Sequence, residues 1–195
     1  MRQEFAGPVK PRGLAVQACN PTSLTIPTGA PGASSGPSSL YPSTVLISGL
    51  TNQVVNKVSV TLNRLTHTYP DDLDIELVGP NGDTCMVMSD AGGATDISDL
   101  SLTLDKDVVA ALPDNDPIPN SSRSWRPADY DGVPDAMPAP APVASTADLG
   151  IFTGDDPNGT WSLFVADDAG GDIGALAGGW CLNLTTVAPA SGCNA

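Results

Sequence analysis

The chain has little positive charge and only one histidine. Its 195 residues include 8 Lys and Arg against 22 Asp and Glu, so the formal net charge is −14, and the single histidine is His67. A surface this acidic repels phosphate backbones and anionic lipid headgroups, which argues against a nucleic-acid partner and against an anionic membrane surface. With one histidine and no CxxC pair, a Cys/His zinc site is not expected either.

Long apolar runs and glutamate are also scarce. No stretch approaches the roughly 18 consecutive apolar residues of a membrane-spanning helix, so no membrane insertion is expected. Glu4 and Glu76 are the only glutamates, and every other acidic residue is aspartate. Because Asp favours turns and hard-cation sites whereas Glu favours helix interiors, the acidic charge is expected in loops.

Several segments of the sequence alternate apolar and polar residues with a period of two. VVNKVSVTLNRL, LDIELVG, TWSLFVA and WCLNLTTV read as strands, LGIF reads as a further short one, and GPNGD and DPNGT are Asn-Gly turns. The fold class predicted is all-β, an antiparallel jelly-roll-type β-sandwich of about eight or nine strands. Three parts are expected: an irregular leader or tail over 1–18, the sandwich over 19–187, and a C-terminal tail over 188–195. Within the sandwich, a Pro- and Asp-rich loop is expected to run over the surface at 113–147.

Several ordered motifs resemble the P/Homo B domain. They read HTYPDDLDIELVGPNG, MSDAGG, LTLDKD and GDDPNGTWSLFVADDAGGDIGALAGGWCLNL, and they cover roughly residues 19–187. That domain is the jelly-roll sandwich that follows the catalytic domain of subtilisin-like proprotein convertases, and this chain looks most like its free-standing bacterial version in secreted and cell-surface proteins. The resemblance implies a module that stabilises or positions a neighbour rather than a catalyst. Cys85, Cys193 and the long 113–147 insert depart from the family pattern.

The four cysteines predict disulfides. An even number in a Gly- and Pro-rich β-type chain indicates a secreted or cell-surface protein. Because terminal strands of a compact domain commonly lie near each other, we expect Cys19 to pair with Cys181, which leaves Cys85 with Cys193. The alternative pairs Cys19 with Cys193 and Cys85 with Cys181.

Aspartates crowd into Gly-containing loops in YPDDLD, MSDAGGATD and ADDAGGDIG. Ca²⁺ takes six to eight oxygen ligands, and glycines let backbone carbonyls turn toward an ion. Some bacterial members of the family that the chain resembles hold calcium at loop aspartates. The hypothesis is therefore one calcium site, with these candidate ligands: Asp71, Asp72, Asp167, Asp168 and Asp172, with Asp90 as a further one. The alternative is that these residues bond their own turns or are solvated.

Two weaker possibilities concern a second ion and catalysis. Asp105 and Asp107 are candidates for a second ion, although Lys106 lies between them. His67 has no G-x-S-x-G serine to serve, so we expect a packed, hydrogen-bonded role for it. Trp161 and Trp180 start strands and are expected in the core, and no aromatic cluster suggests a sugar cleft.

The sequence therefore predicts a non-catalytic, calcium-stabilised, secreted β-sandwich module with a structural, folding-support or adhesion role. Its partner would be a neighbouring domain or protein subunit, possibly another copy of the same chain. One alternative is a self-assembling extracellular filament or surface subunit that exchanges a terminal strand with the next molecule. Another is an accessory fragment of a secreted subtilisin-like protease.

Overall fold

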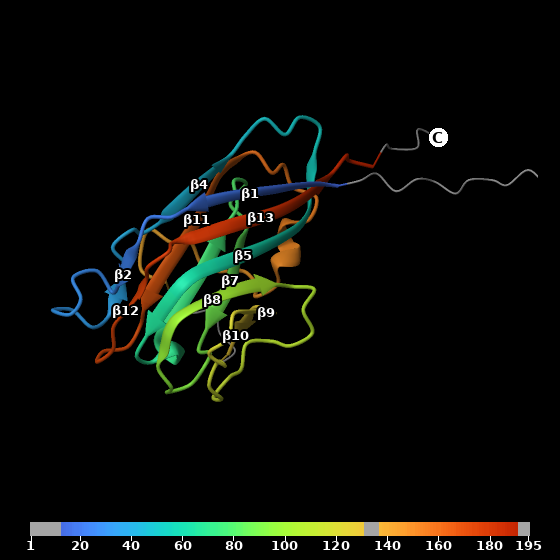
Figure 1. Ribbon diagram of the computed structural model, residues 1–195. Coiled ribbons are helices and arrows are strands. Elements are labelled where there is room, and N and C mark those ends of the chain that lie inside the picture. The colour runs from blue at the N-terminus through green and yellow to red at the C-terminus, as the bar shows by residue number, and fades with distance from the viewer. Residues whose placement is uncertain (1–12, 131–136, 191–195) are drawn as a thin grey trace, which may run out of the picture.

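The computed structural model describes residues 13–130 and 137–190 and shows two β-sheets packed face to face (Figure 1). The predicted all-β sandwich is confirmed. Its thirteen strands exceed the predicted eight or nine because five of them are only two or three residues long. In the described ranges, no helix has the length and apolar character that a membrane crossing requires.

The first sheet has seven strands, and β5 lies at its centre. β5 pairs with β13 on one edge and with β8 on the other, and β12 also pairs with it near its end. The strands are β1 (Leu14–Asn20), β2 (Leu24–Ile26), β5 (Val54–His67), β8 (Ile97–Asp105), β9 (Arg123–Trp125), β12 (Gly174–Leu176) and β13 (Trp180–Val187). Within the part of the chain that the structure describes, β1 pairs with β13 alone and lies at an edge of this sheet.

The second sheet has six strands, with β6 and β11 paired at its centre. Its strands are β3 (Gly36–Pro37), β4 (Ser43–Ile47), β6 (Leu73–Val78), β7 (Thr84–Ser89), β10 (Ala128–Asp129) and β11 (Gly159–Asp167). Two short 3₁₀ helices accompany the strands, η1 (Pro70–Asp72) and η2 (Leu149–Phe152). Between the described strands all pairings are antiparallel except the short parallel ones of β10 with β7 and of β8 with β9, and an isolated parallel bridge joins Ala111 to Arg126.

Three parts of the secondary-structure prediction were wrong. The predicted surface loop over 113–147 contains β9 and β10, because short stretches of it pair in parallel with the edge strands β8 and β7. β1 begins at Leu14, inside the predicted irregular leader, because an edge strand with two largely exposed faces shows only a weak apolar alternation. LGIF forms η2 rather than a strand, because the side chain of Asp148 accepts a hydrogen bond from Gly150 N and caps a helical turn. Residues 1–12, 131–136 and 191–195 lie outside the described residues.

The core lies between the sheets and is built from alternate residues of their facing strands. Trp161 and Trp180 are fully buried in it, as predicted, and each indole N–H has a partner. Trp161 Nε1 donates to Pro157 O at 3.0 Å, and Trp180 Nε1 donates to Ser43 Oγ at 3.0 Å. These acceptors satisfy the buried indole N–H groups, so Trp161 fixes the turn before β11 and Trp180 ties β13 to β4 of the other sheet.

Candidate functional site

Two loops cross between the sheets at one end of the sandwich, and they carry most of the predicted aspartates. One runs from β5 through η1 to β6, and the other runs from β11 to β12. Because β5 pairs with β12 and β6 pairs with β11, the two crossings are neighbours. Their backbones also bond directly, since Asp168 N donates to Asp72 O at 3.1 Å and Thr68 N donates to Ile173 O at 3.2 Å.

A buried contact between His67 and Asp167 joins the sheets at this end. His67 Nε2 lies 3.2 Å from Asp167 Oδ2, and both side chains are inaccessible to solvent. His67 Nδ1 lies 2.8 Å from Tyr69 O, and Asp167 Oδ1 accepts from Ala169 N at 3.2 Å. The predicted packed, hydrogen-bonded role of His67 is confirmed.

The surroundings of this contact favour uncharged groups. Burial lowers the pKa of His67 and raises the pKa of Asp167 to about 6, with further rises from the Asp168 and Asp172 charges. Gly174 lies opposite His67 in the strand register, and a Cβ at that position would collide with Thr66 O and the imidazole ring. Gly174, the last residue of the GDIG motif, therefore leaves space for the imidazole ring of His67.

The carboxyl group of Asp72 lies near those of Asp167, Asp168 and Asp172. Its pKa is raised to about 6, first by burial and then by the negative charges of Asp167, Asp168 and Asp172. Asp172 itself is tied to the neighbouring crossing, because its Oδ1 accepts from Thr68 Oγ1 at 2.8 Å. The structure thus brings four of the six predicted ligands to one end of the sandwich.

The other two predicted ligands point to a different loop. Asp71 Oδ1 accepts from Gly93 N at 3.3 Å, and Asp90 Oδ2 lies 3.2 Å from Ser89 Oγ. Asp71 and Asp72 diverge because consecutive residues of the 3₁₀ helix η1 project in different directions. The six aspartates therefore do not surround one point.

The described ranges contain no group of three or more His, Cys, Asp or Glu side chains positioned to hold a metal ion. A pocket of about 260 Å³ does open beside β11, and its lining includes Asp74, Asp167 and Asp168. An ion in that pocket would need backbone carbonyls and water to complete its shell, since Asp167 already binds His67 and Ala169. The donor set therefore fits calcium only in part.

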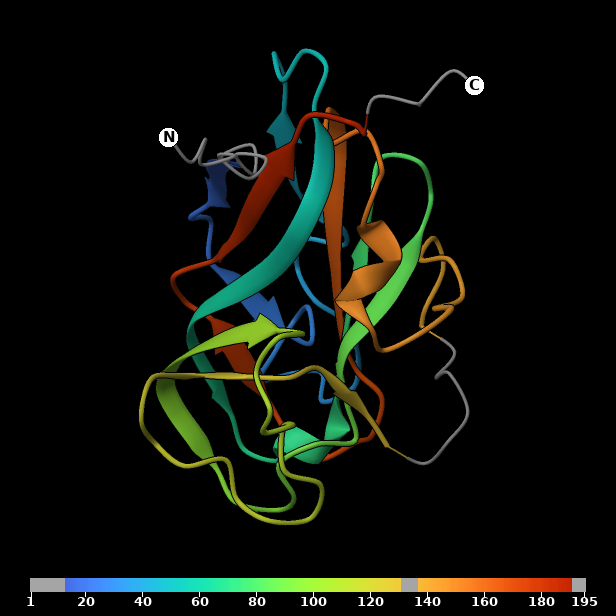
Figure 2. The same cartoon turned by 90° about the vertical axis from the view of Figure 1, so that its right-hand side faces the viewer.

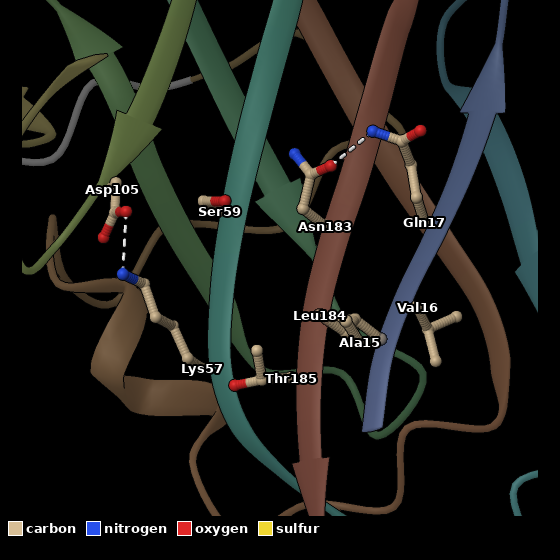
Figure 3. Close-up of a pocket in the computed structure, with 9 residues that line it drawn as sticks. All are labelled: Ala15, Val16, Gln17, Lys57, Ser59, Asp105, Asn183, Leu184 and Thr185. Atoms are coloured by element: carbon tan, nitrogen blue, oxygen red, sulfur yellow. Dashed lines mark hydrogen bonds and ion pairs between the residues drawn. The ribbon is translucent and has the colours of Figure 1, made fainter. Parts of the chain in front are cut away.

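Asp105 and Asp107, the candidates for a second ion, both form ion pairs with a lysine instead. Lys57 Nζ lies 2.8 Å from Asp105 Oδ2 and 2.8 Å from Asp107 Oδ2. Lys57 and Asp105 border a shallow pocket of about 370 Å³ on the outer face of the seven-stranded sheet, shown in Figure 3. On its opposite side, Gln17 Nε2 donates to Asn183 Oδ1 at 2.6 Å. Much of the polar lining is thus paired within the protein.

The cysteines agree with the first predicted pair only. Cys19 and Cys181 lie opposite each other in β1 and β13 and form a disulfide with a Cα–Cα distance of 4.0 Å. This excludes the alternative pairing. Cys85 is a free thiol, fully buried in β7 of the other sheet, so the predicted bridge to Cys193 is not formed there; Cys193 lies outside the described residues.

One residue of chemical interest was not anticipated. Glu76 in β6 is fully buried, and neither of its carboxylate oxygens has a hydrogen-bond partner among the described residues. In the sequence it alternates with Ile75 and Leu77, which is typical of a residue on the outer face of a strand. No local signal marks its burial, because the cluster of its cross-strand neighbours Met86 and Phe164 is completed by Met137 and Ala144, which are distant in the sequence.

Comparisons with known proteins leave the family of this chain open. No protein family matches the sequence, and no curated protein matches it. Among solved structures, a serine protease of Aeromonas sobria aligns with a TM-score of 0.42 and 18% identity over 92% of this chain and 28% of that chain. The complex of that protease with its chaperone aligns with a TM-score of 0.41 and 16% identity over the same shares. This chain therefore spans about 28% of the length of these structures.

Proposed function

We propose that this chain is a non-catalytic β-sandwich module of the P/Homo B type, which stabilises or positions a neighbouring exported protein. A subtilisin-like catalytic domain is one such neighbour that the motif resemblance implies. An extracellular or cell-surface location is supported by the Cys19–Cys181 disulfide, because such bonds persist in oxidising compartments.

The observation that carries this proposal is where the motif residues lie. His67 of the HT motif binds Asp167 of the ADD motif, and both are buried between the sheets. Trp161 of NGTW and Trp180 of GGW are buried, and their N–H groups donate to Pro157 O and to Ser43 Oγ of β4. A histidine without solvent access does not meet a dissolved substrate, so these motifs support a structural rather than a catalytic role.

A hydrolase screen tests the non-catalytic part. The purified chain is assayed against a fluorogenic casein and against aryl glycosides, beside His67→Gln as a matched variant. We expect no turnover above the buffer blank from either protein. Turnover that co-purifies with the chain and disappears in a folded His67→Gln variant would overturn the proposal.

We further propose that calcium stabilises the crossing loops. Support comes from the crowding of Asp72, Asp167, Asp168 and Asp172, whose mutual repulsion a cation would relieve. Asp168, which lines the 260 Å³ pocket, is the predicted ligand best placed to reach such an ion, whereas Asp74 in the same lining already accepts a hydrogen bond from Ser89 Oγ. The partial fit described above makes backbone carbonyls and water necessary further ligands.

Thermal unfolding with EDTA and with millimolar Ca²⁺, disulfide intact, tests the calcium proposal. We expect calcium to raise the unfolding midpoint of the wild type and to lose that effect in Asp168→Asn. Asp99→Asn, at an exposed ion pair with Arg64, is the matched control and should keep the wild-type response. Coincident EDTA and calcium curves for the wild type would contradict calcium stabilisation.

A second candidate function is self-assembly by strand addition. The supporting observation is that, among the described residues, β1 pairs with β13 alone, so no described strand pairs with its other edge. Negative-stain microscopy of the purified chain separates the two proposals. Fibres that disappear when a proline replaces Val16 would favour assembly, whereas dispersed particles would favour the module.

A further inference from the structure

Glu76 occupies an apolar environment on the outer face of the six-stranded sheet. In the strand register it lies opposite Phe164 of β11 on one side and opposite Met86 of β7 on the other. Both neighbours belong to a second hydrophobic cluster, separate from the main core, which also contains Met137, Ala144 and Ala166. The carboxyl group therefore lies between apolar cross-strand neighbours, on the face of its strand that points away from the main core.

The cluster is closed by residues 137–147, which we call the cover segment. It contains no helix or strand and runs beside β7, where Figure 2 shows it in orange. Its start is held by Tyr41 Oη, which donates to Pro138 O at 2.7 Å. Its end is held by Met86 N, which donates to Thr146 O at 2.8 Å, and by Ser145 N, which donates to Thr84 Oγ1 at 2.9 Å. A few hydrogen bonds and the burial of Met137 and Ala144 thus hold the cover segment in the position that excludes water from Glu76.

Over residues 13–130 and 137–190, the ionisable groups near Glu76 offer no positive charge. They are Asp74 on the same strand, Tyr41 before β4, and Cys85 on β7; burial and the nearby carboxylates, Glu76 among them, raise the pKa of Tyr41 and of Cys85. The cover segment has no ionisable side chain, and the only one on β11 is Asp167, which binds His67. Burial alone raises the pKa of Glu76 to about 7.

We propose that the cover segment is a pH-sensitive element, which stays closed while Glu76 is protonated and is released when Glu76 ionises. An uncharged carboxylic acid is tolerated in an apolar cluster, whereas an isolated carboxylate is strongly disfavoured there. Releasing the cover segment admits water to the carboxylate, and the few bonds that hold the segment are the ones to break. Release exposes Met86 and Phe164, so the outer face of this sheet becomes apolar as the pH rises through neutrality.

Hydrogen exchange of the whole chain at pH 5.5 and pH 8.0 tests the proposal, after correction for the intrinsic pH dependence of exchange. The reporters are peptides that contain the amides of Met86, which donates to Thr146 O of the cover segment, and of Ser145, which belongs to the segment and donates to Thr84 Oγ1 of β7. Raising the pH should lower their protection by roughly tenfold or more, because the open state lets Glu76 ionise with a pKa near 4.3. Amides of β13 serve as the internal reference for global unfolding and should change much less.

Two variants identify Glu76 as the cause. Glu76→Gln keeps the size of the protonated side chain without its titration, and Glu76→Leu fills the site with hydrocarbon. Both should keep the cover segment equally protected at the two pH values. Asp72→Asn, which removes a carboxyl group of raised pKa at the other site, should keep the wild-type loss of protection.

Three results would overturn the proposal. The first is equal corrected protection of the wild-type reporter peptides at pH 5.5 and pH 8.0. The second is a loss of protection that persists undiminished in both Glu76 variants. The third is a loss of the same size in β13, which would mean that the whole sandwich opens rather than the cover segment.

Discussion

Asp167 and Glu76 are buried carboxyl groups on paired strands of one sheet, and they differ in what surrounds them. Asp167 has His67 Nε2 at 3.2 Å and Ala169 N at 3.2 Å, whereas Glu76 has no hydrogen-bond partner within the described ranges. Burial raises the pKa of both. With partners, a buried carboxyl group joins two sheets; without them, it makes the structure above it sensitive to pH.

The largest effect is expected from removing the partnered group. Asp167→Ala leaves the imidazole of His67 and the N–H of Ala169 without their acceptor in a buried site, which should lower the free energy of unfolding by about 2–4 kcal/mol. Urea unfolding at pH 7 measures it. Asp99→Ala, at an exposed carboxylate, should change stability by less than about 0.5 kcal/mol.

Stability should also fall as the pH rises from about 5 to about 7.5. A carboxyl group whose pKa is raised by folding binds its proton more tightly in the native state, so its contribution is lost as the pH rises through the folded pKa. Asp72 and Asp167, at about 6, and Glu76, at about 7, all act in this direction. The lowered pKa of His67 opposes them below about pH 6.5. Urea midpoints across this range should decline, and Glu76→Gln should flatten the part between pH 6 and 7.5.

A smaller effect of opposite sign is expected at the unpartnered group. Glu76→Leu replaces a carboxylate by hydrocarbon in an apolar cluster, so it should raise the free energy of unfolding at pH 8 by about 1–2 kcal/mol. At pH 5, where Glu76 is protonated, the gain should shrink. A loss of stability at pH 8 would mean that Glu76 has a partner in solution.

The smallest effect on the free energy of unfolding should come from Asp105 and Asp107, whose carboxylates are ion-paired but accessible to water. Lys57 bridges Asp105 and Asp107 with about 29% of its own side chain exposed, so Lys57→Met should cost less than about 1 kcal/mol. The loss should diminish further in 0.5 M NaCl because salt screens such pairs. A cost as large as that of Asp167→Ala would show that burial is not what separates the two cases.

The sequence predicts the parts of this molecule that depend on local patterns. Alternation identifies the long strands, and the expectation that terminal strands are neighbours finds the Cys19–Cys181 bond. The burial of Glu76 could not be predicted, because Met137 and Ala144, which belong to the same outer-face cluster, lie in a proline-rich segment without periodicity. The divergence of Asp71 and Asp72 depends on a single turn of 3₁₀ helix, which the sequence PDD alone does not predict.

The most direct test of the account is a double-mutant cycle between His67 and Asp167, with urea unfolding of His67→Phe, Asp167→Ala and the double variant at pH 7. If the motif residues hold the two sheets together, the two substitutions should be coupled by about 1–3 kcal/mol, the double variant losing less than the sum of the singles. Additivity within about 0.5 kcal/mol would show that the contact between the sheets contributes nothing, and would contradict the structural role proposed for these motifs.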